Sequence, residues 1–182
     1  MTTGRAVAIF GSAQTEPGSP AWIDAEKTGA RCAGAGLTVV TGGYGGTMEA
    51  ASRGAAMVGG IVIGITVPTI FTTRSAANPY VTRELHASSL VDRLGMLMAE
   101  SHGAIALPGS IGTATELALA WNINHVARRN GGDRLPTVAV GAEWGELAKL
   151  LVERVGAFPG DIEVVADADS AVDWLLAQPE IR

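Results

Sequence analysis

Short apolar segments rich in β-branched residues alternate along this chain with segments of helical length and periodicity. Parallel β-sheets whose connecting helices cover both faces have this pattern, because each strand is buried on both sides. The chain has 182 residues, about the length of one domain. We therefore expect an α/β fold with a doubly wound parallel sheet and helices on both faces, in a single domain of residues 1–182.

The same pattern sets the expected elements. Strands are expected at residues 5–10, 37–40, 61–67, 81–87, 104–107, 136–140 and 163–166. Helices are expected at residues 19–35, 47–58, 90–101, after 113 to about 129, at 144–155 and at 170–177. Ser19 before Pro20 is a typical helix start, and Gly59-Gly60 is a typical helix end. The irregular segment 68–79, which holds Thr72, Thr73, Arg74 and Asn78, is interpreted as a loop over a site.

Glycine is concentrated at the ends of two expected strands. The chain has 24 glycines, and one cluster is Gly42-Gly43-Tyr44-Gly45-Gly46, directly before a helix. Glycines at such a position let backbone amides converge on an anion. The loop is neither a Walker loop nor a GxGxxG motif, since Met48 stands at the last glycine position. A tight strand–helix turn without a ligand remains an alternative.

A second loop, Pro108-Gly109-Ser110-Ile111-Gly112-Thr113, repeats this design and adds hydroxyl groups. Glu116 follows Thr113 by three residues, so both are expected on one face of the first helical turn. Glu116 is the candidate acid beside a phosphate cradle, and the alternative is a capping-box partner or a charge that stabilises the first helical turn. In open parallel sheets, ligands bind at the carboxyl ends of the strands, so the two loops are expected to face one ligand.

Together, these motifs resemble the Lonely Guy (LOG) family, often mislabelled lysine decarboxylase, within a wider group of Rossmann-like nucleotide-binding proteins. The resemblance runs from about Arg5 to Val140. It rests on four segments: Phe10-Gly11-Ser12, Gly42 to Gly46 with Met48, Gly59 to Ile65, and Pro108 to Thr113 with Glu116.

The resemblance implies an enzyme that hydrolyses the N-glycosidic bond of nucleoside 5'-monophosphates such as cytokinin riboside monophosphates. It also implies a homo-oligomer built on a dimer. It assigns catalysis to Glu116 and Arg93. It assigns phosphate and ligand binding to Gly11, Ser12, Gly42, Gly43, Gly45, Gly46, Pro108, Gly109, Ser110, Gly112 and Thr113.

Four positions depart from the family motifs: Leu90, Leu94, Ser110 and Thr115 replace methionine, lysine, glycine and an acid. They place the chain in a divergent branch near the molybdenum-cofactor carrier proteins. The leading expectation is still a phosphoribohydrolase, and the alternative is a non-catalytic binder or carrier of a phosphorylated nucleotide or molybdenum-cofactor-like pterin. An interaction protein that has lost its ligand is a third possibility.

The residues themselves allow a hydrolytic mechanism, because a carboxylate such as that of Glu116 stabilises an oxocarbenium-like centre. Arg93 would anchor phosphate or ribose, or pair with Glu116. The alternative is that Arg93 forms a structural pair with Asp92 or is a surface arginine.

Composition narrows the possible partners, the cellular compartment and the oligomeric state. The formal net charge of −5 disfavours nucleic acid and anionic membrane surfaces as partners. The lone Cys32 and the lack of an apolar leader favour the cytoplasm. We expect neither a cofactor nor a metal, since the histidines have no metal-ligand spacing. The charged fraction of 17% favours at least a homodimer, through the expected helices near residues 90–98 and 117–123.

Overall fold

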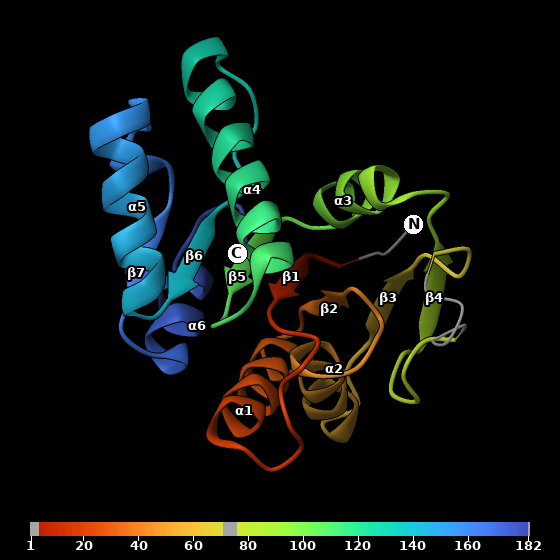
Figure 1. Ribbon diagram of the computed structural model, residues 1–182. Helices are drawn as coiled ribbons and strands as arrows, with labels where there is room; N and C mark the ends of the chain where they lie inside the picture. Colours follow the sequence, from red (N-terminus) through yellow and green to blue (C-terminus); the bar gives the residue numbers. More distant parts are fainter. Residues whose placement is uncertain (1–3, 71–75, 182) are drawn as a thin grey trace.

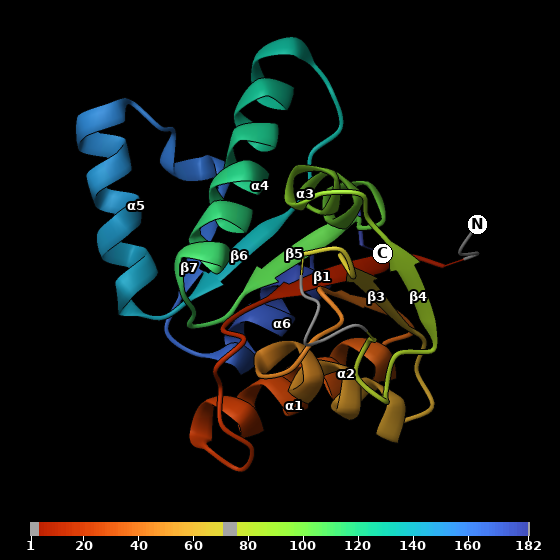
Figure 2. The same cartoon turned by 45° about the vertical axis from the view of Figure 1, so that its right-hand side comes forward.

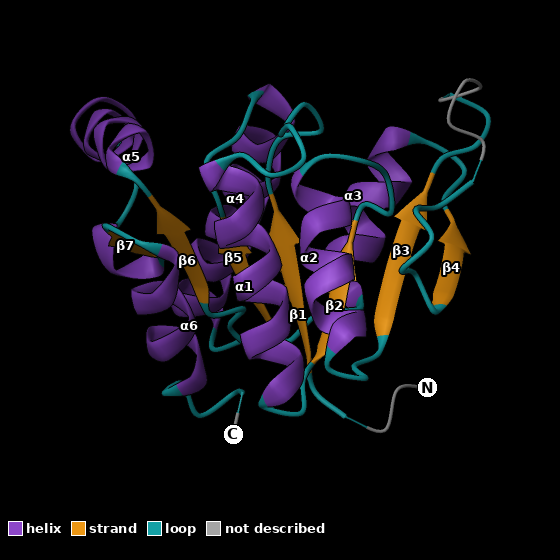
Figure 3. Ribbon diagram, turned by 90° about the horizontal axis from the view of Figure 1, so that it is seen from below, coloured by secondary structure: helices purple, strands orange, loops and turns teal. Residues whose placement is uncertain are grey.

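The computed structural model describes residues 4–70 and 76–181, which form a seven-stranded, wholly parallel sheet (Figure 1). The strand order is β4-β3-β2-β1-β5-β6-β7. The strands are β1 (Ala6–Phe10), β2 (Thr38–Thr41), β3 (Val62–Thr66), β4 (Arg83–His86), β5 (Gly103–Ala106), β6 (Thr137–Val140) and β7 (Glu163–Val165). Figure 3 shows the strands in this order, with their arrows pointing the same way.

Helices cover both faces of this sheet (Figures 1 and 2). The helices are α1 (Pro20–Gly34), α2 (Thr47–Met57), α3 (Leu90–Ala99), α4 (Ile111–Asn130), α5 (Ala142–Val155), α6 (Ala168–Leu176) and the 3-10 turn η1 (Pro159–Asp161). One hydrophobic core joins the sheet to α1, α2 and α6, and a second joins it to α3, α4 and α5. The expected doubly wound α/β fold is thereby confirmed.

The buried strands explain this two-sided packing. Ala6, Ala8 and Phe10 of β1 face one core, whereas Val7 and Ile9 face the other. Because successive side chains of a strand point to opposite faces, a strand that is apolar at every position must be covered on both sides.

Local signals in the sequence also set the helix ends. The Ser19 hydroxyl accepts a hydrogen bond from the Trp22 amide at 3.2 Å, so Ser19 caps α1 as expected. Gly59 adopts a φ of 76° directly after α2, a conformation that favours glycine. Three helices begin two or three residues earlier than expected, since α4, α5 and α6 start at Ile111, Ala142 and Ala168.

The chain reverses its direction of strand addition between β1 and β5, which are hydrogen-bonded neighbours. The loops after β1, β2 and β5 all leave the carboxyl edge of the sheet, where ligands bind in open α/β sheets. Of the loop expected over this site, Thr72, Thr73 and Arg74 lie outside the described residues. Within the described ranges, none of the helices has both the length and the apolar composition needed to cross a bilayer.

Candidate functional site

The loops that carry the predicted ligand-binding residues meet at the strand-order reversal. Gly11 and Ser12 follow β1, and Gly42 to Gly46 follow β2. The segment Pro108 to Ser110 links β5 to α4, and Thr113 lies in the first turn of that helix. Thr47 and Pro108, one from each glycine-rich loop region, line the same pocket of about 220 Å³. The fold thus brings the predicted segments together at one edge of the sheet.

The first glycine-rich loop is held mainly by the protein itself. The Thr47 amide, at the start of α2, donates to the Ser12 carbonyl at 2.8 Å. The Gly43 amide donates to the Thr41 hydroxyl at 3.1 Å, and Gly42 and Gly43 are buried. These groups shape the loop, and the predicted anion site at the start of α2 is partly filled by the Ser12 carbonyl.

Asn78 fastens this loop from the segment before β4. Its side-chain amide donates to the carbonyls of Gly43 and Tyr44, at 3.2 and 3.0 Å. Its backbone amide donates to the Gly43 carbonyl at 2.7 Å. Sequence reasoning gave Asn78 no such role, because only the fold brings residue 78 beside residue 43. The same residue, with Tyr44 and Gly45, lines a pocket of about 360 Å³.

The second loop is open to solvent. Every residue from Pro108 to Gly112 is exposed, and the side chain of Ser110, the N-cap residue of α4, makes no capping hydrogen bond. The first amide bonded within the helix is that of Ala114, which donates to the Ser110 carbonyl at 3.0 Å. The helix therefore supplies no acceptor for the amides before Ala114, and its dipole favours an anion there.

Thr113 adds a buried hydroxyl to this helix start. The residue is 1% exposed, and its Oγ1 atom has no hydrogen-bond partner among the described residues. Gly109 lies directly against it, since a Cβ added to Gly109 would stand 2.2 Å from the Thr113 Oγ1. A buried hydroxyl without a partner is uncommon in native proteins, and a bound water, ion or ligand group is one of the ways in which such a hydroxyl is satisfied. Gly109 is thus glycine because Thr113 occupies the space of its side chain.

A similar pair lies in the first loop. A Cβ added to Gly11 would stand 2.3 Å from the Thr47 Cγ2 atom. The Thr47 hydroxyl, however, is 2.8 Å from the Thr15 hydroxyl, so this threonine is satisfied within the chain. Of the two threonines, only Thr113 has a hydroxyl without a partner among the described residues.

Arg93 lies between the first loop and β3. Its Nε donates to the Ile65 carbonyl at 2.8 Å, and its Nη2 donates to the Gly42 carbonyl at 3.0 Å. The guanidinium lies 5.6 Å from the centre of the Tyr44 ring. Asp92 instead accepts two hydrogen bonds from Ser88, so the alternative of an Arg93–Asp92 pair is wrong.

Glu116 lies beyond the first turn of α4, within electrostatic range of Arg93. Burial raises the pKa of Glu116 to about 7, and the positive charge of Arg93 opposes this rise. Burial likewise lowers the pKa of Arg93, and the charge of Glu116 opposes that change. No ion pair within 4.0 Å joins the two among the described residues. Since Ser110 is the N-cap, a capping box would use Thr113, so Glu116 is not a capping-box partner.

The arrangement therefore leaves the first amides of α4 without an acceptor in the helix and places, one turn further on, a carboxyl group whose pKa is raised to about 7. No group of three or more His, Cys, Asp or Glu side chains able to hold a metal occurs in the described part of the chain.

Known structures share this fold. The molybdenum cofactor binding protein from Rippkaea orientalis is 22% identical, with a TM-score of 0.75, over 96% of this chain and 97% of that one. The molybdenum cofactor carrier protein from Chlamydomonas reinhardtii is also 22% identical, with a TM-score of 0.69, over 96% and 99%. DNA processing protein A from Streptococcus pneumoniae is 15% identical, with a TM-score of 0.58, over 93% and 61%.

Sequence comparison identifies the family. None of the curated proteins is similar enough in sequence to match the chain. The model of the SLOG cluster4 family, however, matches residues 4–127, which include both glycine-rich loops, Arg93 and Glu116. The match confirms the resemblance to the LOG-type group of Rossmann-like proteins. Because it covers more than half of the chain, this protein belongs to the SLOG cluster4 family.

Proposed function

We propose that this protein binds a phosphorylated small molecule, a nucleotide or a phosphorylated pterin, and holds it without breaking a bond. The observation that carries the proposal is the start of α4, where backbone amides without an acceptor in the helix lie beside the buried, unpartnered Thr113 hydroxyl. The phosphate would accept hydrogen bonds from the amides of Ile111, Gly112 and Thr113 and from the Thr113 hydroxyl.

Two features favour ligand binding without hydrolysis over an enzymatic function. Thr115 stands where the LOG motif has the first of two acids, and Leu94 stands where it has lysine. The structural neighbours described above include a molybdenum cofactor binding protein and a carrier of that cofactor. A carrier needs a site that fits its ligand, and it needs no group that stabilises a transition state.

The direct test is the identity of the ligand that copurifies with the protein. Native mass spectrometry, followed by gentle denaturation, should release a phosphate-bearing nucleotide or pterin in near-stoichiometric amount. Isothermal titration with AMP should then show binding without release of adenine. Protein that carries no such ligand, and that binds neither AMP nor inorganic phosphate, contradicts the proposal.

A phosphoribohydrolase is the second candidate, and Glu116 is the observation that favours it. A carboxyl group with a pKa of about 7 is suited to proton transfer at neutral pH, and Glu116 lies on the helix that would hold the phosphate. Chromatography of AMP incubated with protein should then detect adenine. Glu116→Gln should lower its release on the order of a hundredfold, with binding largely kept. Absence of adenine and of other free bases across a panel of monophosphates removes this candidate.

We further propose a homodimer. Leu97, Met98 and Leu117 of the expected dimer helices are buried in the core, so they leave no surface for a partner. Val91 and Ile111, in contrast, are 79% and 84% exposed. These side chains, at the starts of α3 and α4, are the better candidates for an interface. Light scattering at micromolar concentration should give the mass of a dimer, and a monomer mass contradicts this assignment.

A further inference from the structure

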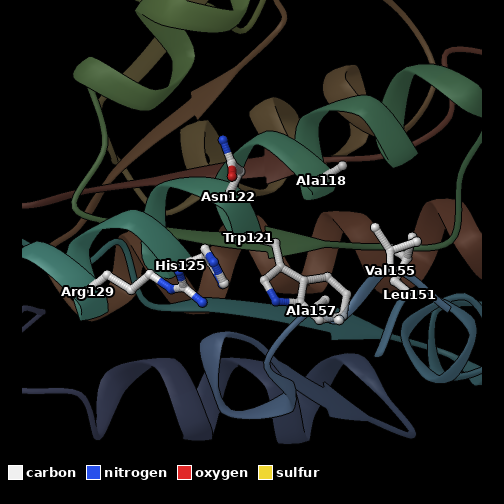
Figure 4. Close-up of a pocket in the computed structure, with 9 residues that line it drawn as sticks. Ala118, Trp121, Asn122, His125, Arg129, Leu151, Val155 and Ala157 are labelled. Carbon is white, nitrogen blue, oxygen red and sulfur yellow. The ribbon is translucent and has the colours of Figure 1, made fainter. Parts of the chain in front are cut away.

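A third pocket lies between α4 and α5, apart from the glycine-rich loops (Figure 4). Its volume is about 370 Å³, within the range of small-molecule sites. Its walls share no residue with the segments assigned to phosphate binding. Any ligand of this pocket is therefore additional to the ligand proposed above.

The α4 wall of the pocket is fixed by hydrogen bonds to the segment around η1. The Trp121 indole Nε1 donates to the Phe158 carbonyl at 3.1 Å. The Asn124 side chain donates to the Asp161 carbonyl at 2.9 Å. The Arg128 Nε donates to the Asp161 carboxylate at 2.9 Å. A pocket with fixed walls loses little entropy when a ligand binds, which favours affinity.

The two ends of the pocket differ in chemistry. Figure 4 shows Arg129 and His125 at one end, Leu151 and Val155 at the other, and the Trp121 ring between them. This order gives the pocket a cationic end, an aromatic middle and an aliphatic end. A ligand that matches it has an anionic group at one end of a ring system.

The polar end keeps groups free for a ligand. Among the described residues, the Arg129 guanidinium has no hydrogen-bond or ion-pair partner, while the buried Asp161 carboxylate is already paired with Arg128. The His125 Nδ1 lies 3.4 Å from that carboxylate and 3.3 Å from the Arg128 Nη2. These contacts orient the ring through Nδ1 and leave Nε2 for a ligand.

We propose that this pocket binds a small aromatic carboxylate. The carboxylate would pair with the Arg129 guanidinium, whose planar fork matches its geometry. It would also accept a hydrogen bond from the His125 Nε2–H, in the tautomer whose Nδ1 accepts from the Arg128 Nη2. The ring would lie against Trp121 and extend toward Leu151 and Val155. Aromatic contact and apolar burial would supply most of the affinity, and Arg129 would supply the selectivity for charge.

The test compares 2-naphthoate with its uncharged analogue 2-naphthamide, by isothermal titration against the full chain. Wild type should bind the carboxylate at least about tenfold more tightly than the amide. Arg129→Gln should remove this preference. Arg83→Gln should keep it, and is the matched control because Arg83 is an exposed arginine on β4, at the other edge of the sheet. Val155→Asp should weaken both ligands, since it places a charge at the apolar end.

Three results would overturn the proposal. One is equal affinity for the two compounds, or the lack of any binding. Another is the same response from Arg129→Gln and Arg83→Gln. The third is displacement of 2-naphthoate by saturating AMP, because the compound would then occupy the phosphate site. A dimer that Val155→Asp converts to a monomer, without any naphthoate binding, would assign the pocket to a second copy of the chain instead.

Discussion

The substitution Thr113→Val, at the start of α4, should change protein stability and ligand affinity in opposite directions. The Thr113 hydroxyl is buried and has no partner among the described residues, so its removal breaks no hydrogen bond there. Valine has nearly the same shape and the same branching at Cβ, so the packing against Gly109 is kept. A buried hydroxyl without a partner costs roughly 1–3 kcal/mol. We therefore expect the free protein to become more stable, by about 1 kcal/mol.

Phosphate binding should change in the opposite direction. A hydrogen bond to a charged group contributes about 1.5–3 kcal/mol, so loss of the Thr113 hydroxyl should raise the Kd of a phosphate ligand about tenfold to a hundredfold. Chemical denaturation measures the first effect, and isothermal titration with AMP and inorganic phosphate measures the second.

Thr115→Val is the matched control. Thr115 lies two residues further along α4, and its exposed hydroxyl donates to the Ile111 carbonyl at 2.8 Å. This change should leave both stability and phosphate affinity nearly unchanged. If Thr113→Val lowers stability, or binds phosphate as tightly as wild type does, the reasoning about the orphan hydroxyl is refuted.

Three further predictions concern the same edge of the sheet. Gly109→Ala should destabilise the protein by about 1–3 kcal/mol and weaken phosphate binding, because its Cβ would stand 2.2 Å from the Thr113 Oγ1. Gly112→Ala is the control, because its Cβ would meet nothing nearer than 4.0 Å, and its free energy of unfolding should be at least that of wild type. Chemical denaturation measures both variants, and an equal loss of stability in the two would contradict the argument. Glu116→Gln should gain stability over wild type as pH rises from 4.5 to about 7, because the wild-type carboxyl ionises in the unfolded chain before it does in the folded protein. The gain should reach about 1–3 kcal/mol, allowing for partial solvent screening, and a pH-independent difference would show that Glu116 titrates normally. Asn78→Ala should speed amide hydrogen exchange in the first glycine-rich loop and lower the free energy of unfolding by about 1–3 kcal/mol, because the carbonyls of Gly43 and Tyr44 lose a donor. Unchanged exchange would mean that Asn78 does not hold the loop.

The two glycine-rich loops illustrate how much of the site was predictable. The sequence predicts both loops at strand ends, and the structure places them at one edge of the sheet. It does not predict that the Ser12 carbonyl fills the start of α2, or that the start of α4 stays open. This difference depends on how the loop after β1 folds over α2, and no local pattern encodes such a contact.

Helix packing shows the same division. Gly29 and Gly54 lie inside α1 and α2, where glycine weakens a helix and signals nothing local. In the fold, a Cβ on Gly29 would stand 2.0 Å from the Ala51 carbonyl oxygen, and one on Gly54 would stand 1.8 Å from that of Glu26. The two glycines let the backbones of α1 and α2 come into contact, and this contact depends on both helices rather than on the sequence of either one.

By itself, the sequence determined the α/β class, the order of the elements, the helix cap at Ser19 and the positions of the loops. These follow from hydrophobic periodicity, capping and turn chemistry, which act over a few residues. The tertiary structure decided that the helix after the second loop starts with amides that have no acceptor in the helix, and that Asn78 holds Gly43. It also decided that Arg93 joins the first glycine-rich loop to β3, and that Glu116 has a raised pKa. Each of these depends on burial or on contacts between residues distant in the chain, because a pKa or an unpartnered hydroxyl is set by surroundings that only the folded chain supplies.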